Sequence, residues 1–227
     1  MKPRICAAIT SGTIEEAIEM AGIAEKDGAD LLELRLDYLK ELKSLADLVK
    51  STSLPTILTL RKRDEGGKFR GSEKERIQAI FKAAEKGFKY VDLELATDSL
   101  TSVVNKLRKV GLNIIISAHN FTDTPTLPDM VRIINKQRQA GADICKLITT
   151  ASTRDDNVAC LNLVSMVSKQ TDVICFAMGK LGVVSRVLSP LIGAYLTFAT
   201  AVKGRESALG QLTVKEMRQI YRLLGVL

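Results

Sequence analysis

The stretch "NIIISAH" at residues 113–119 is a short, nearly continuous apolar run that ends in the only histidine of the 227 residues. Runs of this length and composition are typical of parallel β-strands that are buried on both faces. An amphipathic stretch at 97–110 precedes it and predicts a helix, which Gly111 ends. Helix, glycine and buried strand in this order indicate a fold in which helices and strands alternate.

The same alternation extends along the whole chain. Strands are predicted at 4–10, 31–37, 55–61, 90–95, 113–119, 143–150, 172–178 and 194–201, and helices at 13–30, 40–51, 72–86, 97–110, 126–140, 153–169, 180–192 and 213–224. Eight such units predict an α/β protein with one domain over residues 1–227, a (β/α)₈ TIM barrel. Periodicity alone leaves an open doubly wound sheet as the alternative, although "AITSGTIEEA" lacks the glycine fingerprint of a dinucleotide-binding fold.

The bulk composition narrows the classes of partner. Hydrophobic residues make up 46% and charged residues 26%, and the net charge is +7, which favours an anionic partner. Aromatic residues make up only 4%, without Trp, so a surface that stacks nucleic-acid bases is poorly supplied. The longest uncharged stretch, 187–202, is too short to span a membrane. We therefore expect a cytoplasmic protein that binds neither nucleic acid nor membrane.

The cysteines and the histidine argue against a metal site. The four cysteines have no C-x-x-C spacing, and three of them stand in apolar strand-like runs. Buried free thiols in a reducing compartment account for them better than disulfides do. With a single histidine and dispersed cysteines, no metal is expected.

Several strands carry charges that an apolar core would not tolerate unpaired. Glu33, Arg35 and Asp37 alternate with leucines on the second strand, and Arg61 ends the third strand, with Glu65 in the loop that follows. In a barrel these side chains would line the mouth at the carboxyl ends of the strands, where active sites lie. The other basic residues here are expected to be solvated in a loop and helix start: Lys62, Arg63, Lys68, Arg70, Lys74 and Arg76.

Lys146 is the least expected residue, because it stands within the apolar run "DICKLITT" rather than at its edge. A buried amine tends towards its neutral form and is then a candidate nucleophile that forms a Schiff base with a ketone. His119 ends the neighbouring strand, where it is as plausible a catalyst as a structural residue. Arg186, in the seventh helix, and Ser207 and Gln211, in the eighth loop, add an anion site and neutral hydrogen bonds. Imine formation followed by proton abstraction needs no metal or organic cofactor, since the protonated imine is the electron sink.

The sequence resembles type I 3-dehydroquinate dehydratase, a Schiff-base enzyme of the shikimate pathway, over essentially its whole length. The resemblance rests on six motifs in order: "ELRLD" at 33–37, "TLRKRDEGG" at 59–67, "SAHNF" at 117–121, "CKLITTA" at 145–151, "AMGKLGVVSR" at 177–186 and "ESALGQLT" at 206–213. One position differs, because Leu209 stands where many relatives have proline, a residue that would restrict the loop.

The resemblance implies a role for each of these residues. Lys146 would form the imine with the C3 ketone, His119 would remove the C2 proton and assist the departure of the C1 hydroxyl, and Glu65 would orient His119. Arg186 would pair with the substrate carboxylate. Five further residues would hold the ring hydroxyls and the carboxylate: Glu33, Arg35, Arg61, Ser207 and Gln211. The resemblance also implies a homodimer and no cofactor.

Two other functions fit parts of the pattern. A class I aldolase or transaldolase would share the barrel and the lysine but act on a sugar phosphate, which Gly179 and Gly182 after the seventh strand could bind. A non-catalytic basic barrel that binds RNA or a protein fits the charge of +7, but a buried Lys146 and the scarcity of aromatic residues speak against it.

Overall fold

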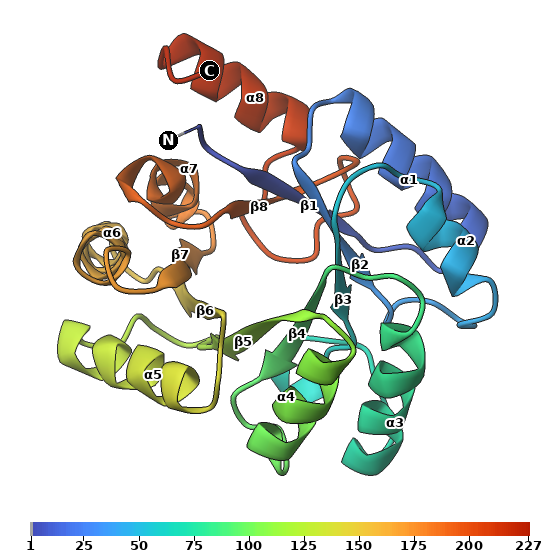
Figure 1. Cartoon of the computed structure of the whole chain (residues 1–227). Coiled ribbons are helices and arrows are strands. Elements are labelled where there is room, and N and C mark those ends of the chain that lie inside the picture. Colours follow the sequence, from blue (N-terminus) through green and yellow to red (C-terminus); the bar gives the residue numbers. More distant parts are fainter. Residues whose placement is uncertain (1) are drawn as a thin grey trace.

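The computed structural model describes residues 2–227 as a ring of eight parallel strands surrounded by eight helices (Figure 1). The strands are β1 (Ile5–Ile9), β2 (Leu31–Arg35), β3 (Thr56–Thr59), β4 (Tyr90–Glu94), β5 (Asn113–His119), β6 (Ile144–Thr150), β7 (Asp172–Met178) and β8 (Thr197–Thr200). The helices are α1 (Ile14–Lys26), α2 (Leu45–Lys50), α3 (Glu73–Ala84), α4 (Leu100–Lys109), α5 (Leu127–Gln139), α6 (Asp155–Val167), α7 (Val183–Ile192) and α8 (Val214–Leu223), and the short 3-10 helix η1 spans Arg63–Glu65.

The strand order decides between a barrel and an open sheet. The strands pair in the order β7-β6-β5-β4-β3-β2-β1-β8, so β8 returns beside β1. No ladder joins β7 to β8 within residues 2–227, but the backbone N–H of Tyr195 donates to the carbonyl of Val173 at 2.7 Å. This contact brings the two ends of the sheet together, and the predicted (β/α)₈ barrel is confirmed in a nearly closed form.

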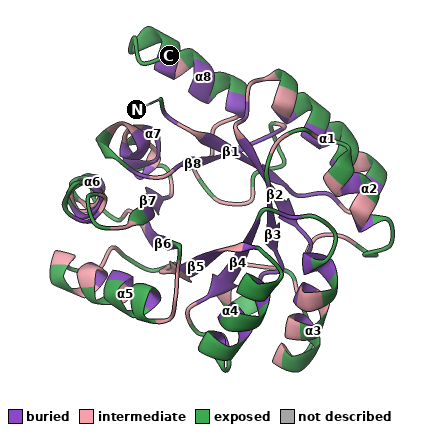
Figure 2. Cartoon of the chain, in the orientation of Figure 1, coloured by how far each residue is buried: buried purple, intermediate pink, exposed green. Residues whose placement is uncertain are grey.

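The apolar side chains form an inner and an outer layer because strand residues alternate between the two faces. Ile57, Ile115 and Ile174 belong to the cluster inside the barrel. Leu32 and Leu34 belong to the larger cluster between the strands and the helices. Figure 2 shows the strands mostly buried and the helices exposed on their outer sides. Charged residues on inward-facing strand positions can therefore lie only in the barrel interior or at its mouth.

The helix boundaries depend on local capping. Thr13 caps α1, since its side chain accepts a hydrogen bond from the backbone N–H of Glu16. Within the stretch 13–30 the helix runs only to Lys26, because Gly28 adopts φ +94° and ends it. Residues 40–44, predicted as the start of the second helix, form a loop instead, and Ser44 adopts a left-handed conformation just before α2. Within the described residues, no helix is long and apolar enough to cross a membrane.

Candidate active site

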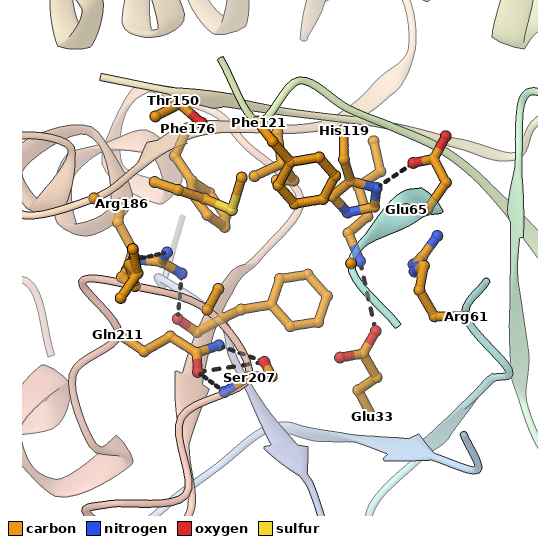
Figure 3. A pocket seen from close by; sticks show the side chains of 18 of the residues that line it. Glu33, Arg61, Glu65, His119, Phe121, Thr150, Phe176, Arg186, Ser207 and Gln211 are labelled. Carbon is orange, nitrogen blue, oxygen red and sulfur yellow. Dashed lines mark hydrogen bonds and ion pairs between the residues drawn. The ribbon is translucent and has the colours of Figure 1, made fainter. Parts of the chain in front are cut away.

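A cavity of about 290 Å³ opens at the carboxyl ends of the strands (Figure 3). Strands β2, β5, β6, β7 and β8 supply side chains from the barrel wall, and the loops after β3, β5, β7 and β8 and helix α7 supply the rest. The cavity brings together all nine site residues predicted from the sequence: Glu33, Arg35, Arg61, Glu65, His119, Lys146, Arg186, Ser207 and Gln211.

Lys146 lies on β6 and is 4% exposed. Its amine donates to Oδ2 of Asp92 at 2.8 Å and lies 3.5 Å from Oε1 of Glu33. The Phe198 ring faces it, with its centroid 4.2 Å from Nζ. The amine is therefore not the isolated group that the apolar sequence run indicated, because two carboxylates hold it in place.

His119 ends β5, beside β6. Ser117 pairs with Lys146 across the two strands, so His119 stands two positions, roughly 6–7 Å, nearer the mouth. Its Nδ1 lies 2.9 Å from Oε2 of Glu65 on η1, and its ring stacks on Phe121 with centroids 5.9 Å apart. Burial and the positive charges of Arg61 and Lys146 hold the pKa of His119 well below its usual value. The imidazole is therefore neutral near pH 7 and can accept a proton.

Glu65 fixes the orientation and the tautomer of that imidazole. Its carboxylate accepts a hydrogen bond from Nδ1–H, which leaves Nε2 unprotonated. Burial raises the pKa of Glu65 above its ordinary range, and Arg61 opposes this shift. The pair resembles the base and its orienting carboxylate in acyl-transfer enzymes.

Two of the three arginines that line the cavity already have carboxylate partners. Arg35 donates from Nε and Nη2 to the two carboxylate oxygens of Asp37, at 2.9 and 2.8 Å. Arg61 lies 2.8 Å from Asp92 and 3.6 Å from Glu94. The positive charges of both guanidinium groups are thus largely compensated within the protein.

Arg186 differs from the other two. Its Nη atoms donate to the carbonyls of Phe198 and Leu209, at 3.2 and 3.5 Å, and its plane lies over the Phe176 ring at 4.3 Å. No carboxylate among the described residues forms an ion pair with it, and its Nε has no hydrogen-bond partner there. Burial lowers the pKa of Arg186 to about 9. A buried cation without a counter-ion is a site that attracts an anion.

The loop after β8 covers part of the cavity. Gln211 accepts a hydrogen bond from the backbone N–H of Ser207 at 2.8 Å, and its Nε2 donates to the Ser207 hydroxyl at 3.1 Å. Leu209, at the rim, is 79% exposed, and its carbonyl accepts from the N–H of Gly179 at 3.2 Å. Gly210 adopts φ +77°, and a Cβ there would lie 2.4 Å from the carbonyl oxygen of Gly179. Glycine is thus required where the two loops meet.

Sequence reasoning missed Asp92 and misjudged Arg76. Asp92 lies on β4, and its Oδ2 binds both the Lys146 amine and Arg61 at 2.8 Å. The signal was present in "YVDLE", where Asp92 and Glu94 face the same side of a buried strand. The interpretation of Arg76 as a solvated residue is wrong, because its side chain is fully buried against Glu94.

Comparisons with known proteins identify the family of the chain. The family described as Type I 3-dehydroquinase matches residues 5–227. A 3-dehydroquinate dehydratase from Dehalococcoides mccartyi is 38% identical over 220 residues, which are 97% of this chain and 95% of that protein. The crystal structure of the 3-dehydroquinate dehydratase from Geobacillus kaustophilus matches with a TM-score of 0.93 at 25% identity, over 99% of this chain and 92% of that one.

A second solved structure has a similar fit. The type I 3-dehydroquinate dehydratase from Clostridium difficile, described with covalently modified comenic acid, matches with a TM-score of 0.89 at 26% identity. The match covers 98% of this chain and 92% of that one.

Proposed function

The chain belongs to the type I 3-dehydroquinase family, and from this premise we propose how its own residues carry out the reaction. It is a hydro-lyase of the shikimate pathway that dehydrates 3-dehydroquinate to 3-dehydroshikimate, with the Schiff-base chemistry of type I enzymes. We assign the whole barrel, residues 1–227, to a single catalytic domain. One observation carries the assignment of roles: a buried amine and a neutral imidazole open into one cavity from adjacent strands.

The covalent steps begin at Lys146. The ammonium of Lys146 gives up one proton, and the neutral amine adds to the C3 ketone. That proton then leaves with the ketone oxygen as water, which gives an imine that is protonated at nitrogen. Breaking the C2–H bond sends its electron pair into this imine, and the Nε2 atom of His119 takes the proton. Asp92, 2.8 Å from the amine, is the counter-ion of the protonated imine.

The leaving group departs in the next step. The C1–O bond breaks, and His119 returns its proton so that the hydroxyl leaves as water and a C1–C2 double bond forms. Hydrolysis of the imine then releases the conjugated ketone and restores the amine. Glu65 holds the imidazole for both proton transfers through the 2.9 Å contact with Nδ1. The chain's own residues thus supply the electron sink and the proton carrier.

Substrate binding follows from the charges of the lining residues. Arg186 has no carboxylate partner among the residues that the structure describes, so we assign the substrate carboxylate to it. Arg35 and Arg61 are paired with Asp37 and Asp92, and they offer their remaining N–H groups to neutral oxygens. We assign the ring hydroxyls to these two arginines together with Glu33, Ser207 and Gln211.

Incubation with 3-dehydroquinate tests the function directly. We expect the absorbance of a conjugated enone to appear, and borohydride with substrate to add mass at Lys146. Cleavage of a carbon–carbon bond in a sugar phosphate, without dehydration of 3-dehydroquinate, would instead indicate an aldolase of the same fold.

We also propose a homodimer that forms through α6 and α7. Helices α6 and α7 lie side by side (Figure 1). After the first turn of α6 they carry no charge except the buried Arg186, whereas α1, α3, α4, α5 and α8 all expose charged residues. Val158, Met166, Val184 and Ile192 are exposed on them. Since each copy carries a net charge of +7, an uncharged face is where two copies approach with least repulsion. Val184→Asp should shift the sedimentation coefficient to that of a monomer.

We propose the cytoplasm as the place of action. All four cysteines are buried free thiols, which is the usual state in a reducing compartment. Fractionation of cells that produce the protein from its natural gene tests this proposal.

A further inference from the structure

A chain of ion pairs runs from helix α3, outside the barrel, to the amine of Lys146 in its interior. On α3 the Arg76 guanidinium lies 2.7 Å from Glu73 and 2.6 Å from Glu94 of β4. The other oxygen of Glu94 lies 3.6 Å from Arg61, and Arg61 lies 2.8 Å from Asp92. Asp92 in turn accepts from Lys146 at 2.8 Å. Positive and negative groups alternate along the whole path.

The chain is almost completely removed from water. Arg76 is 0%, Glu94 1% and Arg61 3% exposed. Apolar side chains of similar volume at such positions are often as stabilising as buried ion pairs, because removing charges from water is costly. Stability alone is therefore a weak reason for ions to replace apolar packing between α3 and the barrel.

Arg76 and Glu94 also hold the backbone on both sides of Arg61. Nη1 of Arg76 donates to the carbonyl of Leu60 at 3.1 Å. Oε1 of Glu94 accepts from the backbone N–H of Lys62 at 3.2 Å. Lys62 is the residue just before η1, which carries Glu65. The same two side chains thus fix the guanidinium of Arg61, its backbone and the start of the segment that orients His119.

We propose that Glu94 and Arg76 are positioning residues that hold the Arg61 guanidinium against Asp92. Through Arg61 they position both the Lys146 amine, which forms the imine, and the segment that carries Glu65. The inference rests on the proposed function, since it assigns to the chain of ions a place in that reaction. Neither residue lines the cavity, so both act through their neighbours rather than on the substrate.

Two single variants test the proposal. Arg76→Met removes the cation with little change in volume, and Glu94→Gln removes the anion but keeps an acceptor for the Lys62 N–H. A displacement of about 1 Å in a reacting group costs on the order of 100-fold in rate, so we expect kcat to fall by roughly 10- to 100-fold in each variant. KM should change less than kcat, because Arg186 is untouched. The rate at which borohydride traps the imine in a single turnover should fall with kcat.

The double variant Arg76→Met/Glu94→Gln separates positioning from general stability. It leaves no unpaired charge at these two positions, so its Tm should return towards that of the parent. A merely structural role predicts that kcat returns with the Tm, whereas a positioning role predicts that kcat stays low. Arg76→Lys should recover part of kcat, because it keeps the charge but cannot bond to both Glu94 and Leu60.

A matched control comes from the opposite end of the barrel. Arg218 on α8 is 6% exposed and lies 2.5 Å from Asp30, just before β2. Arg218→Met should lower the Tm by a similar amount and leave kcat and KM unchanged. Values of kcat within twofold of the parent in folded Arg76→Met and Glu94→Gln would overturn the proposal, as would full recovery of kcat in the double variant.

The proposed function and the positioning role fail in different ways. A parent protein that forms no adduct with substrate at Lys146 contradicts the function, whatever the variants do. The positioning role is then decided by crystal structures of the two single variants. In these we expect the Arg61 guanidinium to move away from Asp92, and an unmoved side chain refutes the role.

Discussion

Nδ1 of His119 lies 2.9 Å from Oε2 of Glu65, on a segment 54 residues earlier in the chain. This contact joins the end of β5 to η1 and decides which imidazole nitrogen is free. Because Glu65 accepts from Nδ1–H, Nε2 carries the lone pair. The imidazole therefore has its Nε2 atom free to accept a proton before any substrate enters.

Removal of the imidazole should slow the reaction without preventing imine formation. A general base contributes on the order of 10²- to 10⁴-fold in rate, so His119→Ala should lose about that much in kcat. Borohydride should still trap substrate on Lys146, since the amine is unchanged. Mass spectrometry of the reduced adduct identifies substrate rather than product. Near-normal turnover of this variant would indicate that His119 has only a structural role.

Removal of the amine should, in contrast, prevent the imine from forming at all. Lys146→Ala has no nucleophile, so borohydride with substrate should add no mass. Turnover should be lost, because the electron sink cannot form. The carboxylates of Asp92 and Glu33 then lose the Lys146 cation, although Asp92 keeps Arg61, so the Tm is measured alongside to confirm folding. Capture of substrate by this variant would place the imine on another lysine.

Arg186→Met should weaken binding and stabilise the fold. A charge-assisted hydrogen bond contributes about 1.5–3 kcal/mol, so KM should rise roughly 10- to 100-fold. The folded protein pays for burying a guanidinium without a carboxylate partner, and its replacement by an apolar side chain should raise the unfolding free energy by about 1–3 kcal/mol. Steady-state kinetics and urea denaturation measure the two effects. A lower stability would indicate that the bonds to the carbonyls of Phe198 and Leu209 outweigh the cost of burial.

The acid limb of the pH profile, where kcat/KM falls as the pH is lowered, should have its midpoint below the usual pKa of histidine, about 6.5. His119 acts as a base only when neutral, and burial together with Arg61 and Lys146 lowers its pKa, so activity persists to a lower pH. Arg61→Met removes one of these positive charges, which raises the pKa of His119 and moves the acid limb upwards. A limb above pH 6.5 in the parent, or a downward shift in the variant, contradicts this assignment.

Treatment with a chelator should leave the activity unchanged. In the proposed reaction the protonated imine on Lys146 accepts the electron pair from the C2–H bond, so this step requires no metal ion. The rate is compared before and after dialysis against a strong chelator. A loss that a divalent ion restores would assign part of the electrophilic role to that ion.

The sequence predicted the fold and most of the cavity because charges inside apolar strands are conspicuous. Lys146 and Arg61 interrupt or end buried runs, and in a barrel such positions lie together at the mouth. Closure of the sheet could not be predicted from periodicity, since the returning contact of β8 with β1 joins residues about 190 positions apart.

The partners of these charges were harder to predict. Asp92 on β4 contacts Lys146 on β6, and β5 lies between them. This contact depends on the register of three strands rather than on any local pattern. Arg76 lies within "SEKERIQ", where alternating charges at a helix start are typical of a solvated surface. Only the docking of α3 on the barrel turns this residue inwards, against Glu94.

The junction of β7 with β8, spanned by the bond from Tyr195 to Val173, has a consequence for motion. Every other pair of neighbouring strands is joined by a ladder within the described residues, so local opening of the barrel costs least free energy here. Arg186 and the loop that carries Leu209 flank this junction, and both belong to the half of the cavity to which we assign the substrate carboxylate. The amine and imidazole lie on the fully laddered strands β5 and β6. We therefore expect a rigid side of the ring, which carries the amine and the imidazole, and a more compliant side, to which we assign the substrate carboxylate.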